Sequence, residues 1–122
     1  MRTILIVEDQ EDVQVLLGMA LRHPGRRLLS ASNAEQGLAL ARSEHPDLIL
    51  LDIMMPGGMD GLAMLRSLRA DPSSADIKVV IMSARTQQKN IAAAFAAGAD
   101  EYLRKPFRLK ELKDTVARHL EG

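Results

Sequence analysis

Five side chains that could bind a cation or take part in group transfer directly follow apolar runs of strand length: Glu8, Asp9, Asp52, Ser83 and Lys105. The carboxyl ends of parallel strands share one edge of a sheet, and ligands of open parallel sheets bind at that edge. We therefore expect these five side chains to lie close together.

Three carboxylates at neighbouring strand ends repel one another. Each pair at 4 Å costs about 1 kcal/mol in water and about 4 kcal/mol at an effective dielectric of 20. A cation is therefore expected among Glu8, Asp9 and Asp52. An all-oxygen site without His or Cys favours Mg²⁺ over zinc or copper. Mg²⁺ and Lys105 around one carboxylate are typical of phosphoryl transfer, with Asp52, at the tip of the most apolar strand, as the acceptor.

Each of these residues also has a simpler interpretation when it is taken alone. Glu8 and Asp9 could cap the first helix, where an acid suits the helix dipole. Asp52 and Ser83 could be ordinary turn residues, and Lys105 a solvated charge. The combination of the five residues at matching strand ends favours a common site.

The surrounding chain alternates short apolar runs with segments of helical period, which predicts an α/β fold. The strands are expected at residues 3–7, 27–31, 48–51, 77–82 and 101–104. Helices are expected at residues 34–44, 61–70, 87–97 and 109–120, after a first helix whose apolar stripe is Val13, Leu16, Leu17, Ala20 and Leu21. Asn33 and Gln36 resemble a capping box, and Leu109 is expected to face inward with Leu112, Val116 and Leu120. Right-handed crossovers favour a single doubly wound, five-stranded parallel sheet of order 2-1-3-4-5, flanked by five helices as in flavodoxin-like folds.

Length and composition suit one soluble domain over residues 1–122. The chain has 122 residues, 47% of them apolar, and zero formal net charge. That balance argues against direct binding of nucleic acid or an anionic membrane. The chain has no cysteine, which excludes a disulfide framework and fits the cytoplasm, and no apolar run approaches the length of a membrane span. One further interpretation is that Glu121 and Gly122 are added residues and that an output domain has been removed.

Over essentially its whole length the sequence resembles the receiver domain of two-component response regulators, of the chemotaxis-regulator type. The matching segments are Glu8-Asp9, Leu50-Leu51-Asp52-Ile53-Met54-Met55-Pro56, Asp60-Gly61, Ser83-Ala84 and Tyr102-Leu103-Arg104-Lys105-Pro106-Phe107. The resemblance implies a phosphorelay signalling switch in which Asp52 accepts a phosphoryl group from a histidine kinase or a histidine phosphotransfer protein. Such a domain catalyses only its own phosphorylation and dephosphorylation.

The resemblance also implies the roles of individual residues. Asp9, Asp52 and the Met54 backbone carbonyl would ligate Mg²⁺, and Glu8 would do so through water. Ser83 and Lys105 would contact the phosphoryl oxygens, and Tyr102 would change rotamer with Ser83. The Lys105–Pro106 bond would be a cis turn. The phosphorylated form would alter the surface of the fourth helix, fifth strand and fifth helix, which controls an output domain or a downstream protein.

The sequence departs from the family pattern at two places. Gly57, Gly58 and Met59 separate Pro56 from Asp60 by one residue more than usual, which lengthens the loop beside the acceptor. Thr115 stands where the subfamily that dimerises to bind DNA has an arginine, so Glu101 is expected to lack that salt bridge to the fifth helix. A DNA-binding output of that kind is therefore less favoured.

Three other classes of protein fit the residues less well. An aspartyl phosphohydrolase would need a second acid two residues after Asp52, where Met54 stands. A flavodoxin-like or dinucleotide-binding module would need a glycine- or hydroxyl-rich phosphate loop in place of the acidic residues 8–12. A receiver-shaped module that binds partners without phosphate remains the third alternative, and the intact set of five site residues argues against it.

Overall fold

The computed structural model describes residues 1–54, 59–85 and 87–121 of the chain. Over these residues strands and helices alternate in the following order: β1 (Arg2–Val7), α1 (Glu11–Leu21), β2 (Arg26–Ala31), α2 (Ala34–Glu44), β3 (Leu48–Asp52), α3 (Gly61–Ala70), β4 (Lys78–Ser83), α4 (Gln88–Ala96), β5 (Glu101–Arg104) and α5 (Leu109–Glu121). None of the helices in these ranges is both long and apolar enough to cross a bilayer.

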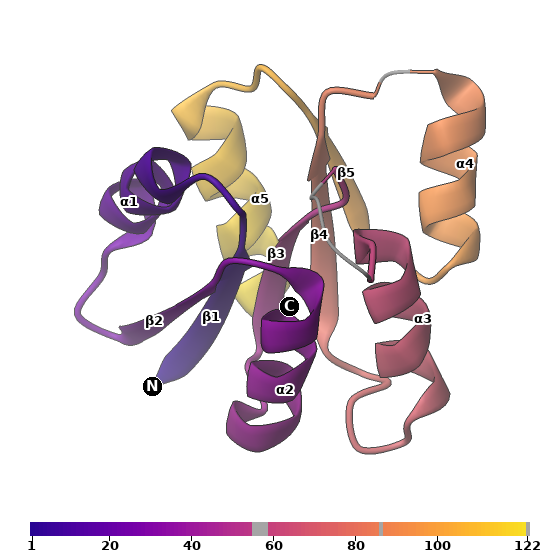
Figure 1. Cartoon of the computed structure of the whole chain (residues 1–122). Coiled ribbons are helices and arrows are strands. Elements are labelled where there is room, and N and C mark those ends of the chain that lie inside the picture. Colours follow the sequence, from indigo (N-terminus) through magenta and orange to yellow (C-terminus); the bar gives the residue numbers. More distant parts are fainter. Residues whose placement is uncertain (55–58, 86, 122) are drawn as a thin grey trace.

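The five strands form one sheet in the order β2-β1-β3-β4-β5, and every neighbouring pair is parallel (Figure 1). This arrangement confirms the predicted doubly wound topology. All five residues of β3 are buried, as expected for the most apolar run of the sequence at the centre of the sheet. The order places the ends of β1 and β3 side by side, next to the end of β4.

Helices cover both faces of the sheet: α1 and α5 lie on one side, and α2, α3 and α4 on the other (Figure 1). Each face has its own apolar cluster, because successive strand residues point to opposite faces. Leu48 and Leu50 of β3 pack in the α1/α5 cluster, whereas Ile49 and Leu51 pack in the α2/α3/α4 cluster. A fully buried side chain of this size contributes about 1.5–3 kcal/mol, so these clusters hold the strand ends in place.

Helices α2 and α3 begin and end where the sequence predicts. Their N-caps are Asn33 and Asp60, whose side-chain oxygens accept the backbone N–H groups of Gln36 and Ala63, each at 2.7 Å. The Gln36 side chain in turn accepts the N–H of Ser32 at 2.8 Å, close to the predicted capping box. The other predicted bounds differ from the observed ones by at most one residue at either end.

The structure corrects two predicted core positions. Leu16 is 52% exposed and Leu109 is 42% exposed, although both were expected to face inward. In α1 the buried residues are Leu17 and Leu21, so Leu16, next to Leu17, points outward. In α5 the buried residues are Leu112, Thr115, Val116 and Leu120, which begin almost one turn after Leu109.

We expect the His45→Gly variant to be more stable than the wild type by roughly 1 kcal/mol. His45 ends α2 with φ 47° and ψ 60°, the left-handed conformation in which a Cβ atom is unfavourable. Urea denaturation measures the change. The control is Ser43→Gly, which places glycine inside the same helix and is expected to destabilise by about 0.5 kcal/mol. Equal effects of the two variants would contradict the prediction.

Candidate functional site

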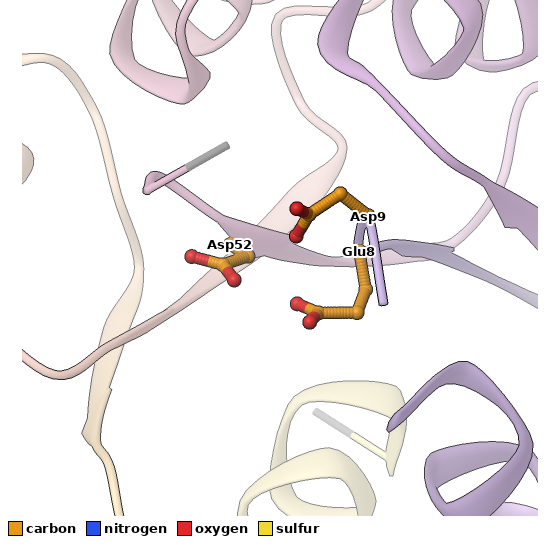
Figure 2. Close-up of side chains that lie close together, drawn as sticks. All are labelled: Glu8, Asp9 and Asp52. Carbon is orange, nitrogen blue, oxygen red and sulfur yellow. The ribbon is translucent and has the colours of Figure 1, made fainter. Parts of the chain in front are cut away.

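The predicted site residues meet at the carboxyl-terminal edge of the sheet. Glu8 and Asp9 directly follow β1, Asp52 and Ser83 are the last residues of β3 and β4, and Lys105 directly follows β5. The carboxyl groups of Glu8, Asp9 and Asp52 turn toward a shared space (Figure 2). One oxygen from each of them lies within 4.8 Å of the others.

Asp52 and Glu8 are buried beneath the exposed Asp9. Asp52 Oδ1 accepts the Met54 N–H at 2.8 Å, and its Oδ2 lies 3.1 Å from Lys105 Nζ. Glu8 is fully buried, and neither of its carboxylate oxygens has a hydrogen-bond partner among the described residues. Lys105 Nζ lies 3.5 Å from Glu8 Oε2 without hydrogen-bond geometry. Lys105 is therefore the cation shared by the two buried acids.

Burial and charge separate the pKa values of the two buried acids. Burial, followed by the adjacent Asp52 carboxylate, raises the pKa of Glu8 to about 7. Burial alone would also raise the pKa of Asp52, but the adjacent Glu8 carboxyl, the Met54 N–H and the Lys105 ammonium group outweigh it and lower that pKa. Burial would lower the pKa of Lys105, yet Asp52 and Glu8 raise it. Near neutral pH, Asp52 and Lys105 are thus both charged.

The simpler interpretations hold only in part. The N-cap of α1 is Gln10, without a side-chain hydrogen bond, so capping by Glu8 or Asp9 is wrong. Asp52 Oδ1 does form a turn with Met54, and Ser83 Oγ accepts the Arg85 N–H at 3.0 Å, so both act as turn residues as well.

The interpretation of Lys105 as a solvated surface charge is also tested by the structure. The Lys105 side chain is 25% exposed and lies within 4 Å of two carboxylates, which corrects the interpretation of a solvated charge. The peptide bond that follows it, to Pro106, is cis.

Ser83 and Tyr102 contact the same stretch of backbone. Ser83 is fully buried and accepts the N–H of Arg85, while the Tyr102 hydroxyl donates to the carbonyl oxygen of Arg85 at 2.8 Å. The sequence alone did not single out Arg85. The Arg85 backbone links Ser83, at the end of β4, to the Tyr102 hydroxyl on β5. A movement that alters its contact with Ser83 therefore also alters its contact with Tyr102.

The acidic group fits a magnesium ion. It offers three carboxylates, which are hard oxygen ligands, and in the part of the chain that the structure describes no imidazole or thiolate belongs to it. The two buried Glu8 oxygens have no hydrogen-bond partner within residues 1–54, 59–85 and 87–121, which is costly in an apolar interior unless a cation or water satisfies them. Asp9, Asp52 and Glu8 would hold the ion, and the exposed position of Asp9 leaves the group open to solvent.

Without metal, the stability of the protein is expected to fall as the pH rises from about 4.5 to about 7. The pKa of Glu8 is about 7 in the folded state, against 4.5 for a free side chain, so the folded state holds the extra proton in this interval. Its stabilising effect is complete below pH 4.5 and is lost as the pH rises through 7. Urea denaturation in EDTA should therefore show that Glu8→Gln gains stability relative to wild type with increasing pH. The exposed-acid control Glu11→Gln should follow the wild type, and parallel curves for wild type and Glu8→Gln would contradict the assignment.

The structure corrects the expected absence of a salt bridge between Glu101 and the fifth helix. Arg118 Nη2 lies 2.7 Å and His119 Nε2 3.1 Å from Glu101 Oε2, so α5 supplies its cation one turn beyond Thr115. Burial would raise the pKa of Glu101, but these two partners outweigh it and lower the pKa.

The lengthened loop lies mostly outside the described residues. Gly57 and Gly58 lie outside the described residues, and the prediction about their spacing stays a prediction. Met59, which the structure describes, donates its backbone N–H to Glu35 Oε1 at 3.2 Å.

Comparison with known proteins gives a consistent result. Residues 4–117 match the family described as response regulator receiver domain. The chain is 40% identical over 113 residues to the KDP operon transcriptional regulatory protein KdpE of Escherichia coli, covering 93% of this chain and 48% of that protein. It is 37% identical over 111 residues to the phosphate regulon transcriptional regulatory protein PhoB of Pseudomonas aeruginosa, covering 91% and 48%. The chain thus spans about half the length of these curated relatives.

A solved structure agrees with the sequence matches. The signal receiver domain of a DNA-binding response regulator from Colwellia psychrerythraea superposes with a TM-score of 0.92 at 28% identity and covers 100% of both chains. Fold, acidic group and sequence matches agree that this chain belongs to the response regulator receiver domains of two-component systems, which are not conventional enzymes.

Proposed function

We propose that the domain is a phosphorylation switch in which Asp52 accepts a phosphoryl group from a phosphohistidine of a kinase or phosphotransfer protein. The observation that carries this proposal is the placement of Lys105 Nζ, 3.1 Å from Asp52 Oδ2, within a group of three carboxylates. A carboxylate with a lowered pKa, a paired ammonium group and a site fit for Mg²⁺ form the set of groups that phosphoryl transfer needs.

In the proposed transfer an oxygen of Asp52 forms a bond to phosphorus while the bond from phosphorus to the donor nitrogen breaks. The electron pair of that bond leaves with the imidazole, so the reaction is a balanced group transfer without an oxidant or reductant. A bound Mg²⁺ would supply charge neutralisation for the phosphoryl oxygens. Lys105, freed from its pairing with Asp52, keeps its charge and is within reach of the new phosphoryl group, and the Met54 N–H holds Oδ1 of the acceptor.

The switch itself would depend on Ser83 and Tyr102. In this structure the Arg85 backbone bonds to both side chains. A phosphoryl oxygen that draws in the Ser83 hydroxyl would weaken its contact with the Arg85 N–H, and the Tyr102 hydroxyl would lose its fixed acceptor. This pair of contacts supports a population shift at the start of α4 and along β5, and the shift alters the α4–β5–α5 surface.

The output is proposed to be a further domain or a partner protein that reads this surface. The curated relatives named above are transcriptional regulators of about twice the length. A DNA-binding output is therefore compatible with the sequence, even though Thr115 made it less favoured. Direct binding of nucleic acid by the domain itself is not proposed, because its formal net charge is zero.

Intact mass measured after incubation with acetyl phosphate, with and without Mg²⁺, tests the proposal. We expect one phosphoryl adduct that requires Mg²⁺ and that borohydride reduction and peptide mapping place on Asp52. Adducts on several carboxyl groups, or an adduct equally abundant in EDTA, would contradict a metal-assisted site. Absence of any adduct in folded protein would instead favour the module that binds partners without phosphate.

A further inference from the structure

The side-chain amide of Gln14, in the first turn of α1, contacts the backbone that carries the acidic group. Its Nε2 donates to the Glu8 carbonyl oxygen at 2.5 Å and to the Ala31 carbonyl oxygen at 3.2 Å. A longer contact of 3.4 Å reaches Ser32 Oγ. One side chain thus joins α1 to the ends of both β1 and β2.

The Glu8 carbonyl belongs to the peptide unit that links Glu8 to Asp9. The other end of this segment is held by the Glu8 N–H, which donates to Ala31 O at 3.0 Å, so Ala31 O accepts from both Glu8 N–H and Gln14. α1 has no side-chain cap that could fix the segment from its other side. The direction of the Glu8–Asp9 peptide, and with it the position of the Asp9 side chain, therefore depends on the Gln14 amide.

We propose that Gln14 is a positioning residue for the metal site, and that its amide holds Asp9 within reach of the ion that Glu8 and Asp52 also face. The inference rests on the proposed function, because it assigns Gln14 a role in the metal site used there. Gln14 is half-buried and neutral, so it acts by hydrogen bonding without changing the charge of the acidic group. Side chains that orient metal ligands typically affect metal affinity 10- to 100-fold.

The test compares Gln14→Met, which keeps the length of the side chain and removes the donor, with wild type and with Gln88→Met. Gln88 is an exposed glutamine at the start of α4, at a distance from the acidic group along the chain and on another helix. Calorimetric titration with Mg²⁺ at about pH 8, above the pKa of Glu8, measures affinity directly. Thermal unfolding in EDTA measures any purely structural effect.

For Gln14→Met we expect the Mg²⁺ Kd to rise about 10- to 100-fold. The Mg²⁺ concentration that half-saturates phosphoryl uptake should rise by the same factor, while the rate at saturating Mg²⁺ stays within about threefold of wild type. Gln88→Met should behave as wild type in both measurements. Gln14→Asn, whose shorter side chain withdraws the amide from Glu8 O, provides a second variant with the same expected direction.

A Gln14→Met protein that melts at a lower temperature but binds Mg²⁺ as wild type does would overturn the inference, because the residue would then be structural only. In that case wild-type uptake remains Mg²⁺-dependent and the proposed function stands. If the wild type itself neither binds Mg²⁺ nor forms an adduct, both the proposed function and the role of Gln14 are overturned.

Discussion

Asp52→Asn is expected to lower phosphoryl uptake below about a thousandth of the wild-type rate at every Mg²⁺ concentration. The amide has no negative charge, so it is a poor nucleophile for phosphorus. Its side chain also cannot form the ion pair that holds the Lys105 ammonium group beside the acceptor, where it would stabilise the charge of the phosphoryl group. Intact mass during incubation with acetyl phosphate measures the rate, and circular dichroism confirms that the variant is folded.

Two further variants test which acidic residue carries the phosphoryl adduct. Asp76→Asn, at an exposed position before β4, should form the adduct at the wild-type rate. Asp9→Asn should still be modified on Asp52 but should need more Mg²⁺, because it loses a ligand of the acidic group. If Asp9→Asn abolished the adduct while Asp52→Asn retained it, the exposed acid would be the acceptor and the assignment of Asp52 would be wrong.

Arg69→Ala is expected to lower the free energy of unfolding by about 2–4 kcal/mol. Its guanidinium group, at the end of α3, donates to the carbonyl oxygens of Gly98, Ala75 and Ile77 and to Asp100 Oδ2, at 2.7–3.0 Å. Removing it leaves two partly buried carbonyls, one partly buried carboxylate and the exposed Ala75 carbonyl without this partner, and each partly buried loss costs on the order of 1 kcal/mol. Urea denaturation measures the change.

The shape of the Arg69 guanidinium group allows one side chain to donate to all four acceptors. Arg69→Lys keeps the charge but can reach fewer of the four acceptors, so it should recover less than half of the lost stability. Arg66→Ala removes an exposed arginine from the same helix and should stay within about 0.5 kcal/mol of wild type. Equal losses for Arg66→Ala and Arg69→Ala would show that general helix charge, and not the four hydrogen bonds, is responsible.

Local signals in the sequence were enough to predict the fold. Asn33 and Asp60 are strong N-cap residues, and the helices that follow them were predicted with the bounds that the structure has. The alternation of apolar runs and helical stripes predicted a doubly wound parallel sheet, and the order 2-1-3-4-5 was drawn in part from the resemblance to receiver domains. Leu16 was misplaced because Leu16 and its neighbour Leu17 both fit a broad helical stripe, and only packing against the sheet decides which of them is buried.

The acidic site could be predicted because strand ends of a parallel sheet share an edge. Contacts between segments that are far apart in the sequence could not be predicted in this way. The four acceptors of Arg69 are mostly backbone carbonyls, which carry no signal in the sequence. The same holds for the contacts of Gln14 with Glu8 and Ala31. Arg118, the partner of Glu101, lies one turn after position 115, where the subfamily that dimerises to bind DNA has its arginine. Residues one turn apart lie on the same face of a helix, so either can reach Glu101. A comparison with the family pattern one position at a time overlooks this.

The assembly of the site from separate strands has a consequence for the newly made protein. Lys105 follows the last strand and reaches an acceptor 53 residues earlier, and β5 is held in the sheet by β4 alone. A chain still emerging from the ribosome, in which Lys105 has not yet been made, carries Glu8, Asp9 and Asp52 without the lysine that pairs with them. Domains fold as units once their last element is available, so competence for phosphoryl uptake should arise only after that strand has docked.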